Sequence, residues 1–245
     1  MADTKVALIT GSTSGIGRAT ALRLAAEGYD IAAVARRTAR LEALREEISA
    51  RPQQCLPVTC DLSEAGAAGR MTEEVLAHFG RLDVVVASAG HGRGYGPLGE
   101  AEQGHWPSAL AVNLSSVMDL AGAALQPLRE SSGTLVLIGS VFGIDPAPDY
   151  AAYAAAKHGL RGFVRSIRRE QNMEGVRVCL LNPGTTNTEF ASVLRGDTEP
   201  MVHDPAVWGF EPLLPEDVAA AVAWVAGQPA HVDVEEITIR ATRDR

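Results

Sequence analysis

A serine, a tyrosine and a lysine are the first residues of this sequence whose types and spacing could do chemistry. Ser140 directly follows the apolar run Thr134–Gly139, and Tyr153 and Lys157 lie four residues apart in an alanine-rich stretch. We expect that stretch to be helical, so that its positions i and i+4 share a face. A hydroxyl, a phenol and an ammonium that meet at the end of a strand could move protons on and off an oxygen atom. The three residues therefore predict acid–base catalysis at one edge of the protein.

A glycine-rich turn near the N-terminus predicts a nucleotide site. The apolar run Lys5–Thr10 is typical of a buried parallel strand, and Arg18–Glu27 has helical periodicity. A glycine turn between them lets the backbone approach a pyrophosphate, to which the helix offers free N–H groups and a positive dipole end. The spacing is G-x-x-x-G-x-G rather than G-x-G-x-x-G, so a turn whose glycines serve packing alone is the alternative. The candidate cofactor-binding residues here are Gly11, Ser12, Thr13, Ser14, Gly15, Ile16 and Gly17.

Two arginines after the second predicted strand bear on the choice of nucleotide. That strand, Asp30–Ala35, ends without a carboxylate and leads into Arg36 and Arg37. An acidic residue at this place would accept hydrogen bonds from an unphosphorylated ribose, whereas an arginine accommodates a 2'-phosphate. The pair therefore favours NADP, unless the arginines only begin the exposed helix predicted over Arg40–Ser49.

Asp61 and Leu62 follow the third predicted strand, Gln54–Thr59. A carboxylate just beyond a strand end could accept a hydrogen bond from an adenine amino group. Asp61 or Ser63 could equally cap the helix predicted over Ala65–Phe79. The sequence leaves both interpretations open.

Strands and helices alternate along the rest of the chain, which predicts one α/β domain over residues 1–245, a doubly wound sheet of seven parallel strands flanked by helices.

Asn113 lies in an apolar helical stretch, where a buried amide needs hydrogen-bond partners. The glycine-rich residues 91–97 are either a mobile loop at the active edge or a plain surface loop. Residues 189–214 are irregular and rich in proline, and we expect them to form a flap over the site. The remaining predicted strands are Val84–Ala87, Val176–Leu181 and Glu236–Arg240, and the remaining helices are Trp106–Glu130, a helix from Tyr150 onward, and Glu216–Ala226.

Composition narrows the possible partners. The formal charge of -8 disfavours nucleic acid, and the scattered cysteines Cys55, Cys60 and Cys179 predict neither a disulfide framework nor a zinc site. The six histidines show no metal-ligand spacing, so we expect no metal. No apolar run reaches the roughly 18 residues of a membrane span. These features predict a soluble, cytoplasmic protein without membrane contact.

The motifs taken together resemble those of the short-chain dehydrogenase/reductase family. The resemblance covers nearly the whole chain, in order and at family spacings, and implies a Rossmann-type fold. The ending VEEITIR and the stretch PGTTNTEF look like those of bacterial NADP-dependent reductases and dehydrogenases of small hydroxy acids, amino alcohols and aldehydes. Among these enzymes, the two stretches are most similar to the clavulanic aldehyde reductase branch. The residues that carry the family resemblance are Gly11–Gly17, Asp61-Leu62, Asn113, Ser140, Tyr153, Lys157 and Pro183–Thr188.

The resemblance implies a role for each of these residues. Tyr153 would be the general acid in reduction, and Lys157 would hold the nicotinamide ribose and lower the pKa of the tyrosine from about 10. Ser140 would bond the substrate oxygen, and Asn113 would hold a water in a proton path. The implied cofactor contacts are Asp61 to adenine, Arg36 and Arg37 at the 2'-phosphate, Thr188 to the carboxamide, and Leu62, Ser88, Ala89, Gly90, Pro183, Gly184, Thr186, Tyr153 and Lys157 elsewhere along the cofactor.

One stretch departs from the family pattern. After the fourth strand the family usually has Asn-Asn-Ala-Gly, and this chain has Ala87-Ser88-Ala89-Gly90. The hydrogen bonds of the missing amides must be made by other groups, which puts cofactor affinity or local rigidity in doubt.

The sequence thus predicts an NADPH-dependent oxidoreductase that reversibly reduces a carbonyl group of a small molecule, with Tyr153 as acid and base. The resemblance also implies a homo-oligomer, a tetramer or a dimer. A dinucleotide-binding sensor or scaffold without catalysis is one alternative, and an epimerase or dehydratase of the same fold is another. Ser140, Asn113, Tyr153 and Lys157 weigh against the sensor, because a protein without catalysis has no need to keep all four.

Overall fold

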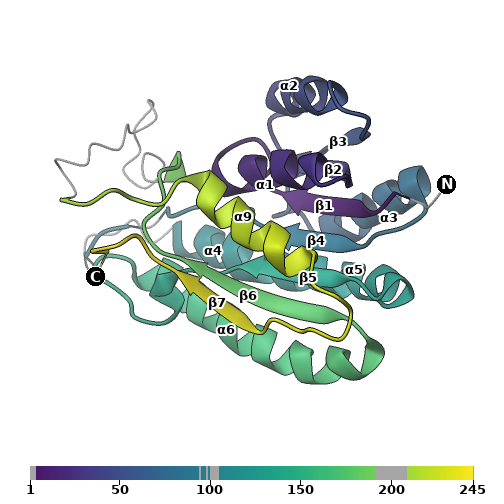
Figure 1. Cartoon of the computed structure of the whole chain (residues 1–245). Helices are drawn as coiled ribbons and strands as arrows, with labels where there is room; N and C mark the ends of the chain where they lie inside the picture. Colours follow the sequence, from purple (N-terminus) through teal and green to yellow (C-terminus); the bar gives the residue numbers. More distant parts are fainter. Residues whose placement is uncertain (1–3, 94, 98, 100–104, 191–208, 245) are drawn as a thin grey trace.

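Seven parallel strands form one sheet in this computed structural model, which describes residues 4–93, 95–97, 99, 105–190 and 209–244 (Figure 1). The order across the sheet is β3-β2-β1-β4-β5-β6-β7. The order reverses between β1 and β4, and at such a switch point an open sheet leaves a crevice beyond its strand ends. The strands are β1 (Val6–Thr10), β2 (Asp30–Ala35), β3 (Cys55–Thr59), β4 (Val84–Ala87), β5 (Thr134–Ile138), β6 (Arg177–Pro183) and β7 (Glu236–Ile239).

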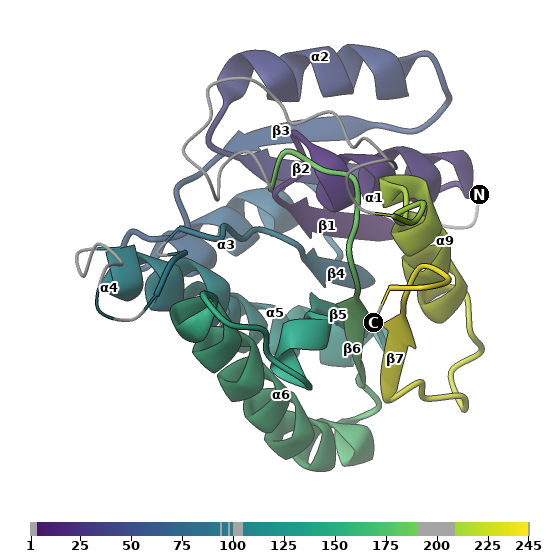
Figure 2. The ribbon, with the colours of Figure 1, turned by 90° about the vertical axis from the view of Figure 1, so that its left-hand side faces the viewer.

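Helices cover both faces of the sheet (Figure 2). One face carries α1 (Gly15–Ala26), α2 (Thr38–Ser49) and α9 (Pro215–Ala226). The other face carries α3 (Ala67–Phe79), α5 (Ser116–Ser131) and α6 (Ala151–Gln171), with the short α4 (His105–Leu110) beside them. Two short 3-10 turns, Val141–Gly143 and Asn172–Glu174, follow β5 and α6.

The two faces of the sheet bury separate cores because side chains alternate along a strand. In β1, Val6 and Leu8 join the core under α3, α5 and α6, whereas Ala7 and Ile9 join the core under α1 and α9. All five residues of β1 are buried, which is why the strand is a continuous apolar run rather than an alternating one. The predicted doubly wound α/β fold is thereby confirmed.

The predicted element boundaries are close to those observed. The strands Asp30–Ala35 and Val84–Ala87 begin and end as expected, because the polar residues Arg36 and Ser88 directly follow their apolar runs. The helix after Tyr150 begins at Ala151 and continues to Gln171. Of the predicted flap over 189–214, residues 191–208 lie outside the described residues.

The helical segment predicted over Trp106–Glu130 is confirmed, since residues 105–131 are helical without a break. A π-helical turn at Ala111–Ser115 separates α4 from α5, and Asn113 is the buried residue of that turn. By length and mean hydropathy (1.4) the segment Trp106–Ser131 would suit a membrane span, and the same composition suits a helix packed against a sheet, which is its position here.

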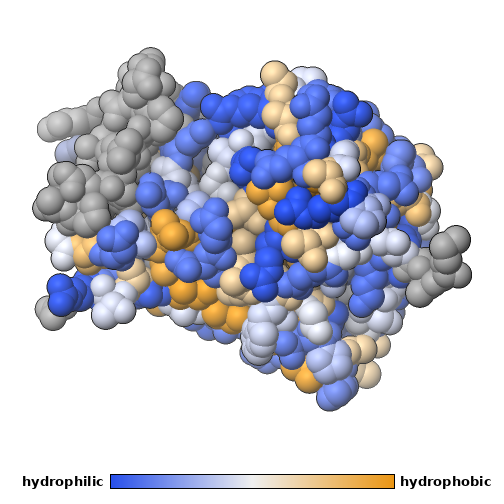
Figure 3. All heavy atoms as spheres, turned by 45° about the horizontal axis from the view of Figure 1, so that its top comes forward, coloured by the Kyte–Doolittle hydropathy of each residue, from blue (hydrophilic) through white to orange (hydrophobic). Residues whose placement is uncertain are grey.

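The outer surface is mixed in polarity. On the face shown in Figure 3, hydrophilic side chains surround smaller apolar areas. Among the described residues, the large apolar side chains with the most exposure include Met173 (89%) and Trp224 (56%). Such isolated apolar side chains are ordinary on a protein surface.

Candidate active site

The predicted site residues gather around one cavity at the carboxyl ends of the strands. Because all seven strands are parallel, their last residues lie along the same edge of the sheet. The cavity has a volume of about 760 Å³ and reaches from the glycine turn to Tyr153. Every predicted site residue except Ser12 contributes to its lining, and Ser12 is fully buried behind the turn.

Ser140, Tyr153 and Lys157 lie together, as their spacing predicted. The hydroxyl groups of Ser140 and Tyr153 share a hydrogen bond. The Lys157 Nζ lies 5.6 Å from the centre of the Tyr153 ring and donates to the Ile138 carbonyl at 2.7 Å. Ser140 and Lys157 are both buried. A phenol and a hydroxyl side by side can hold a carbonyl oxygen between them and give it a proton.

The pKa values of the pair differ from what the family resemblance implies. Burial raises the pKa of Tyr153 to about 12, although the hydrogen bond with Ser140 acts in the opposite direction. Burial likewise lowers the pKa of Lys157 to about 8, which weakens it as the positive charge that would acidify a phenol. The expected lowering of the Tyr153 pKa is therefore not found here, and the phenol is protonated at neutral pH, as a general acid must be.

The low pKa of Lys157 predicts a pH-dependent stability. An ordinary lysine in the unfolded chain has a pKa of 10.5, so between about pH 8 and 10.5 the unfolded chain binds more protons than the folded protein. The contribution of Lys157 to stability therefore rises with pH in that window, by roughly 2 kcal/mol between pH 8 and pH 10. Burial also raises the pKa values of Cys55 and Cys179 to about 12, which lowers stability as pH rises through 9, so the effect of Lys157 has to be measured as a difference. Urea unfolding at a series of pH values should show the wild type gaining this stability relative to Lys157→Met. Parallel curves for the two proteins would contradict it.

Asn182 positions Ser140 and was missed at the sequence level. Its Oδ1 accepts from the Ser140 N–H at 3.2 Å, and its Nδ2 donates to Glu236 Oε1 at 2.8 Å. A Cβ on Gly139 would lie 2.1 Å from the same Oδ1, so only glycine fits before the serine. The available signal was an amide at the end of the apolar strand Val176–Leu181, because a buried amide needs partners.

Asn113 joins the π-helical turn to the loop after β4. Its Nδ2 donates to the carbonyls of His91 (2.7 Å) and Ala109 (2.9 Å), and its Oδ1 accepts from the His91 N–H at 3.1 Å. A Cβ added to Gly90 would lie only 2.7 Å from the same Oδ1, so the close approach of this amide requires glycine there. These bonds show a structural role for the amide, and the water-holding role stays a prediction.

The glycine turn fits a dinucleotide. Gly11 has a φ of +69°, and a Cβ there would lie 3.0 Å from Ala89 N and Cα. A Cβ on Gly17 would lie 2.4 Å from Gly11 O, so α1 packs directly on the turn. The Ser14 hydroxyl does not cap α1, which leaves the first N–H groups of that helix to a ligand. Close backbone approach and free donors beside a cavity are what a pyrophosphate needs.

Thr10 does the work expected of the missing asparagines. Its Oγ1 accepts from the N–H groups of both Ser88 and Ala89, at 3.1 Å each. The exit of β4 is thereby held to β1 without an amide side chain.

The adenosine side of the cavity carries Asp61 and Arg36. Asp61 Oδ1 accepts from the N–H (3.0 Å) and hydroxyl (2.7 Å) of Ser63, which holds a turn ahead of α3. These hydrogen bonds lower the pKa of Asp61, against a smaller effect of burial. Neither Asp61 nor Ser63 caps α3, whose N-cap is Gly66, so that interpretation was wrong. Its other oxygen lies 3.9 Å from Arg36 Nη1, and the Arg36 side chain is 68% exposed.

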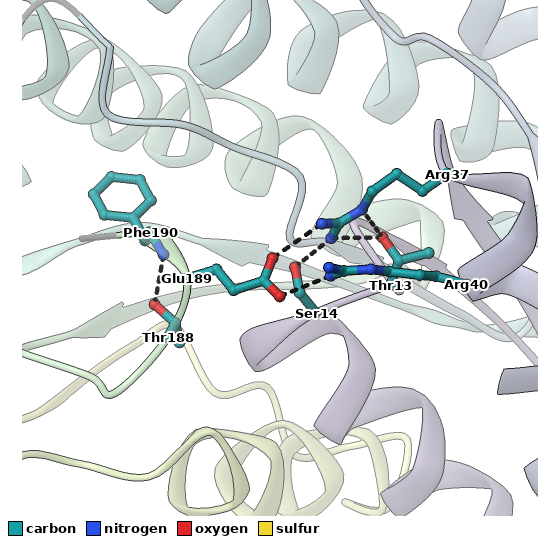
Figure 4. Close-up of polar contacts among 7 residues, drawn as sticks. All are labelled: Thr13, Ser14, Arg37, Arg40, Thr188, Glu189 and Phe190. Atoms are coloured by element: carbon teal, nitrogen blue, oxygen red, sulfur yellow. Dashed lines mark hydrogen bonds and ion pairs between the residues drawn. The ribbon is translucent and has the colours of Figure 1, made fainter. Parts of the chain in front are cut away.

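Arg37 and Arg40 converge on Glu189, as Figure 4 shows. Arg37 Nη2 also donates to Thr13 Oγ1 (3.0 Å) and Ser14 Oγ (2.8 Å) of the glycine turn. Arg37 was predicted as a site residue from its place after β2, whereas Arg40 and Glu189 were not. No local pattern links them, because Glu189 is 149 residues from Arg40 in the chain.

The segment after β6 closes the cavity on the catalytic side. Thr188 packs on the glycine turn, since its Cγ2 would lie 3.0 Å from a Cβ on Gly15. Thr186 Oγ1 donates to Gly184 O at 2.9 Å, and Asp244 Oδ2 accepts from the Thr185 N–H at 2.8 Å. Pro183 is the last residue of β6 and also lines the cavity.

Aromatic side chains surround the catalytic phenol. The Tyr153 ring lies 5.2 Å from Phe190 and 6.4 Å from Phe142, centre to centre. Tyr150 lies 4.6 Å from Phe142 and 4.9 Å from Tyr95. Rings from the loop after β4, the segment after β5, the start of α6 and the segment after β6 thus form an apolar wall beside the hydroxyl pair.

Comparisons with known proteins agree with this architecture. The family model described as short chain dehydrogenase matches residues 5–199. The chain is 30% identical to serine 3-dehydrogenase of Agrobacterium fabrum over 95% of this chain and 92% of that protein. It is 32% identical to sulfoacetaldehyde reductase 2 of Chromohalobacter salexigens, over 97% and 94%.

Solved structures agree as well. An alcohol dehydrogenase from Thermococcus sibiricus complexed with 5-hydroxy-NADP superimposes with a TM-score of 0.89, at 30% identity over 98% of each chain. The closed form of a serine dehydrogenase complexed with NADP+ gives 0.88, at 27% identity over 96% of this chain and 94% of that one. The subgroup resemblance to clavulanic aldehyde reductases stays a prediction. With a matching family model over most of its length, a doubly wound sheet and a serine, tyrosine and lysine at its edge, the chain belongs to the short-chain dehydrogenase family of oxidoreductases.

Proposed function

We propose that this oxidoreductase uses NADP(H) to reduce an aldehyde or ketone to an alcohol, and that the reaction is reversible. The observation that carries the proposal is the hydrogen-bonded pair of Ser140 and Tyr153 at one end of a cavity that begins at the glycine turn. The NADP named in the similar structures, together with arginines after β2 in place of an acid, supports the phosphorylated cofactor.

The residues of this chain divide the work. When bound, NADPH supplies the hydride that reduces the carbonyl carbon. Ser140 and Tyr153 hold the carbonyl oxygen, and Tyr153 transfers its phenolic proton to that oxygen, so that the product is a neutral alcohol. Asn182 fixes Ser140 through its backbone N–H. Lys157, with Nζ near the Tyr153 ring, is placed to hold the nicotinamide ribose.

The lining near Tyr153 supports an uncharged substrate with an apolar or aromatic group. Phe142, Tyr150 and Phe190 contact one another or Tyr153, and Asp145, which follows the turn after β5, is another residue that lines the cavity. Burial of apolar substrate surface against this wall would stabilise the complex by about 25 cal/mol per Å². A carboxylate in the lining would repel an anionic substrate. The relatives named for serine and sulfoacetaldehyde act on small polar compounds, so this chain would differ from them in substrate.

A substrate panel tests the proposal. NADPH oxidation should be observed with simple aldehydes and ketones, and kcat/KM should be at least about tenfold higher for an aryl aldehyde than for an anionic aldehyde such as sulfoacetaldehyde. A preference for the anionic aldehyde would contradict the substrate class alone. Absence of NADPH oxidation across the panel, with NADPH still bound, would favour the sensor. Interconversion of substrates without net NADPH oxidation would favour an epimerase or dehydratase.

We also propose that the protein is a cytoplasmic homo-oligomer, a dimer or a tetramer. The resemblance to the short-chain dehydrogenase/reductase family supports this assembly, because the resemblance implies a homo-oligomer.

A further inference from the structure

Glu189 joins two parts of the cavity that are far apart in sequence. Its Oε2 accepts from Arg37 Nη1 at 3.0 Å, and its Oε1 accepts from Arg40 Nη1 at 2.7 Å (Figure 4). Arg37 precedes α2 and Arg40 lies in its first turn, whereas Glu189 follows β6. One carboxylate thus engages two guanidinium groups, one through each oxygen.

Arg37 is held at the rim of the nucleotide cavity. Its other hydrogen bonds go to Thr13 and Ser14, so the guanidinium stands directly beside the glycine turn. Arg37 and Glu189 both line the cavity. Two guanidinium groups that converge on paired oxygens form the arrangement that also binds a phosphate group.

The carboxylate of Glu189 lowers the net positive charge at this corner of the cavity, where the arginines of the β2–α2 segment lie. Arg36, Arg37 and Arg40 contribute three positive charges, and Asp61 and Glu189 contribute two negative ones. Burial acts to raise the pKa of Glu189, but the hydrogen bonds and charges of Arg37 and Arg40 outweigh it, so the pKa is lower than usual and the group is ionised at neutral pH. The corner therefore offers a 2'-phosphate one net positive charge rather than two.

We infer that Glu189 reduces the preference of this enzyme for NADP(H) over NAD(H). Its carboxylate occupies the guanidinium groups of Arg37 and Arg40, which a 2'-phosphate would use. A phosphorylated cofactor must displace the carboxylate from at least one arginine, and an unphosphorylated cofactor leaves the bridge intact. Glu189 thereby weakens the discrimination in favour of NADP(H). This inference rests on the proposed use of NADP(H).

The position of Glu189 connects this choice to the catalytic side. Its neighbour Thr188 packs on the glycine turn, and its other neighbour, Phe190, contacts the Tyr153 ring. Glu189, which binds the arginines, therefore lies between a residue that contacts the glycine turn and a residue that contacts the catalytic phenol.

Binding of two cofactor fragments tests the inference without any turnover. Isothermal titration calorimetry with 2',5'-ADP and 5'-AMP compares ligands that differ by the 2'-phosphate. For Glu189→Gln we expect the Kd of 2',5'-ADP to fall about fivefold and that of 5'-AMP to stay unchanged. Arg40→Gln should raise the Kd of 2',5'-ADP alone. Glu42→Gln, which removes an equal charge from the Glu42–Arg45 pair of α2, should change neither.

Each result has a distinct meaning. A Kd for 2',5'-ADP that is unchanged or higher in Glu189→Gln would overturn the inference, because the carboxylate would then not compete with the phosphate. Equal tightening of both ligands, or equal tightening in Glu42→Gln, would also overturn it, since the effect would be one of general charge. If the wild type binds 5'-AMP as tightly as 2',5'-ADP, and Arg40→Gln changes neither, the proposed NADP(H) preference itself fails.

Discussion

Tyr153→Phe is expected to lower kcat for carbonyl reduction by about a thousandfold and to leave NADPH affinity within a factor of about two. The ring keeps its contacts with Phe142 and Phe190, so the substitution removes only the phenolic oxygen. That oxygen carries the proton given to the substrate, and with a pKa raised by burial to about 12 it is protonated throughout the neutral range. Ser140 can still donate a hydrogen bond but cannot replace the lost acid.

Steady-state NADPH oxidation and cofactor fluorescence measure the two quantities separately. Tyr29→Phe is a matched control, because Tyr29 is a buried tyrosine outside the residues that line the cavity, and it should keep wild-type kcat. Tyr153→Phe with more than about a tenth of the wild-type kcat would exclude Tyr153 as the general acid. Loss of NADPH binding together with activity would instead indicate a damaged site.

Gly17→Ala is expected to have the largest effect on the cofactor side, with the free energy of unfolding lowered by about 1–3 kcal/mol and binding of 2',5'-ADP largely lost. The added Cβ would lie 2.4 Å from Gly11 O and 2.7 Å from Gly11 C, and both are backbone atoms. Neither can rotate away, so either α1 or the glycine turn must move. The helix and the turn both line the part of the cavity where a pyrophosphate would bind, and the hydrogen bonds to a pyrophosphate tolerate little displacement of their donors.

Urea unfolding and calorimetry with 2',5'-ADP measure these effects. Gly69→Ala on α3 is the matched control, because no atom lies within 4 Å of its added Cβ. Alanine inside a helix should stabilise the protein by about 0.5–1 kcal/mol there and leave binding unchanged. Wild-type stability and affinity in Gly17→Ala would mean that the close packing of α1 on the turn is not required.

The helical segment Trp106–Glu130 was predicted from the sequence, but the π-helical turn inside it was not. Its apolar periodicity is continuous, yet the helix widens into a π-helical turn at Ala111–Ser115. The amide of Asn113 in that turn hydrogen-bonds to the backbone of His91, on the loop after β4. The position and satisfaction of that amide depend on a segment 22 residues away, which periodicity within the helix does not record.

The sequence alone determined the order of the elements, the sheet edge that carries the site, and the grouping of Ser140, Tyr153 and Lys157. These follow from short-range rules: apolar runs end at glycine or polar residues, positions i and i+4 share a helix face, and parallel strands end on one side. Only the tertiary structure decided that Asn182 holds Ser140, that Thr10 replaces two asparagines, and that Glu189 meets Arg37 and Arg40. It also decided the raised pKa of Tyr153 and the lowered pKa of Lys157. Burial and long-range polar contacts depend on which segments pack together in space, and no local spacing of residues encodes that.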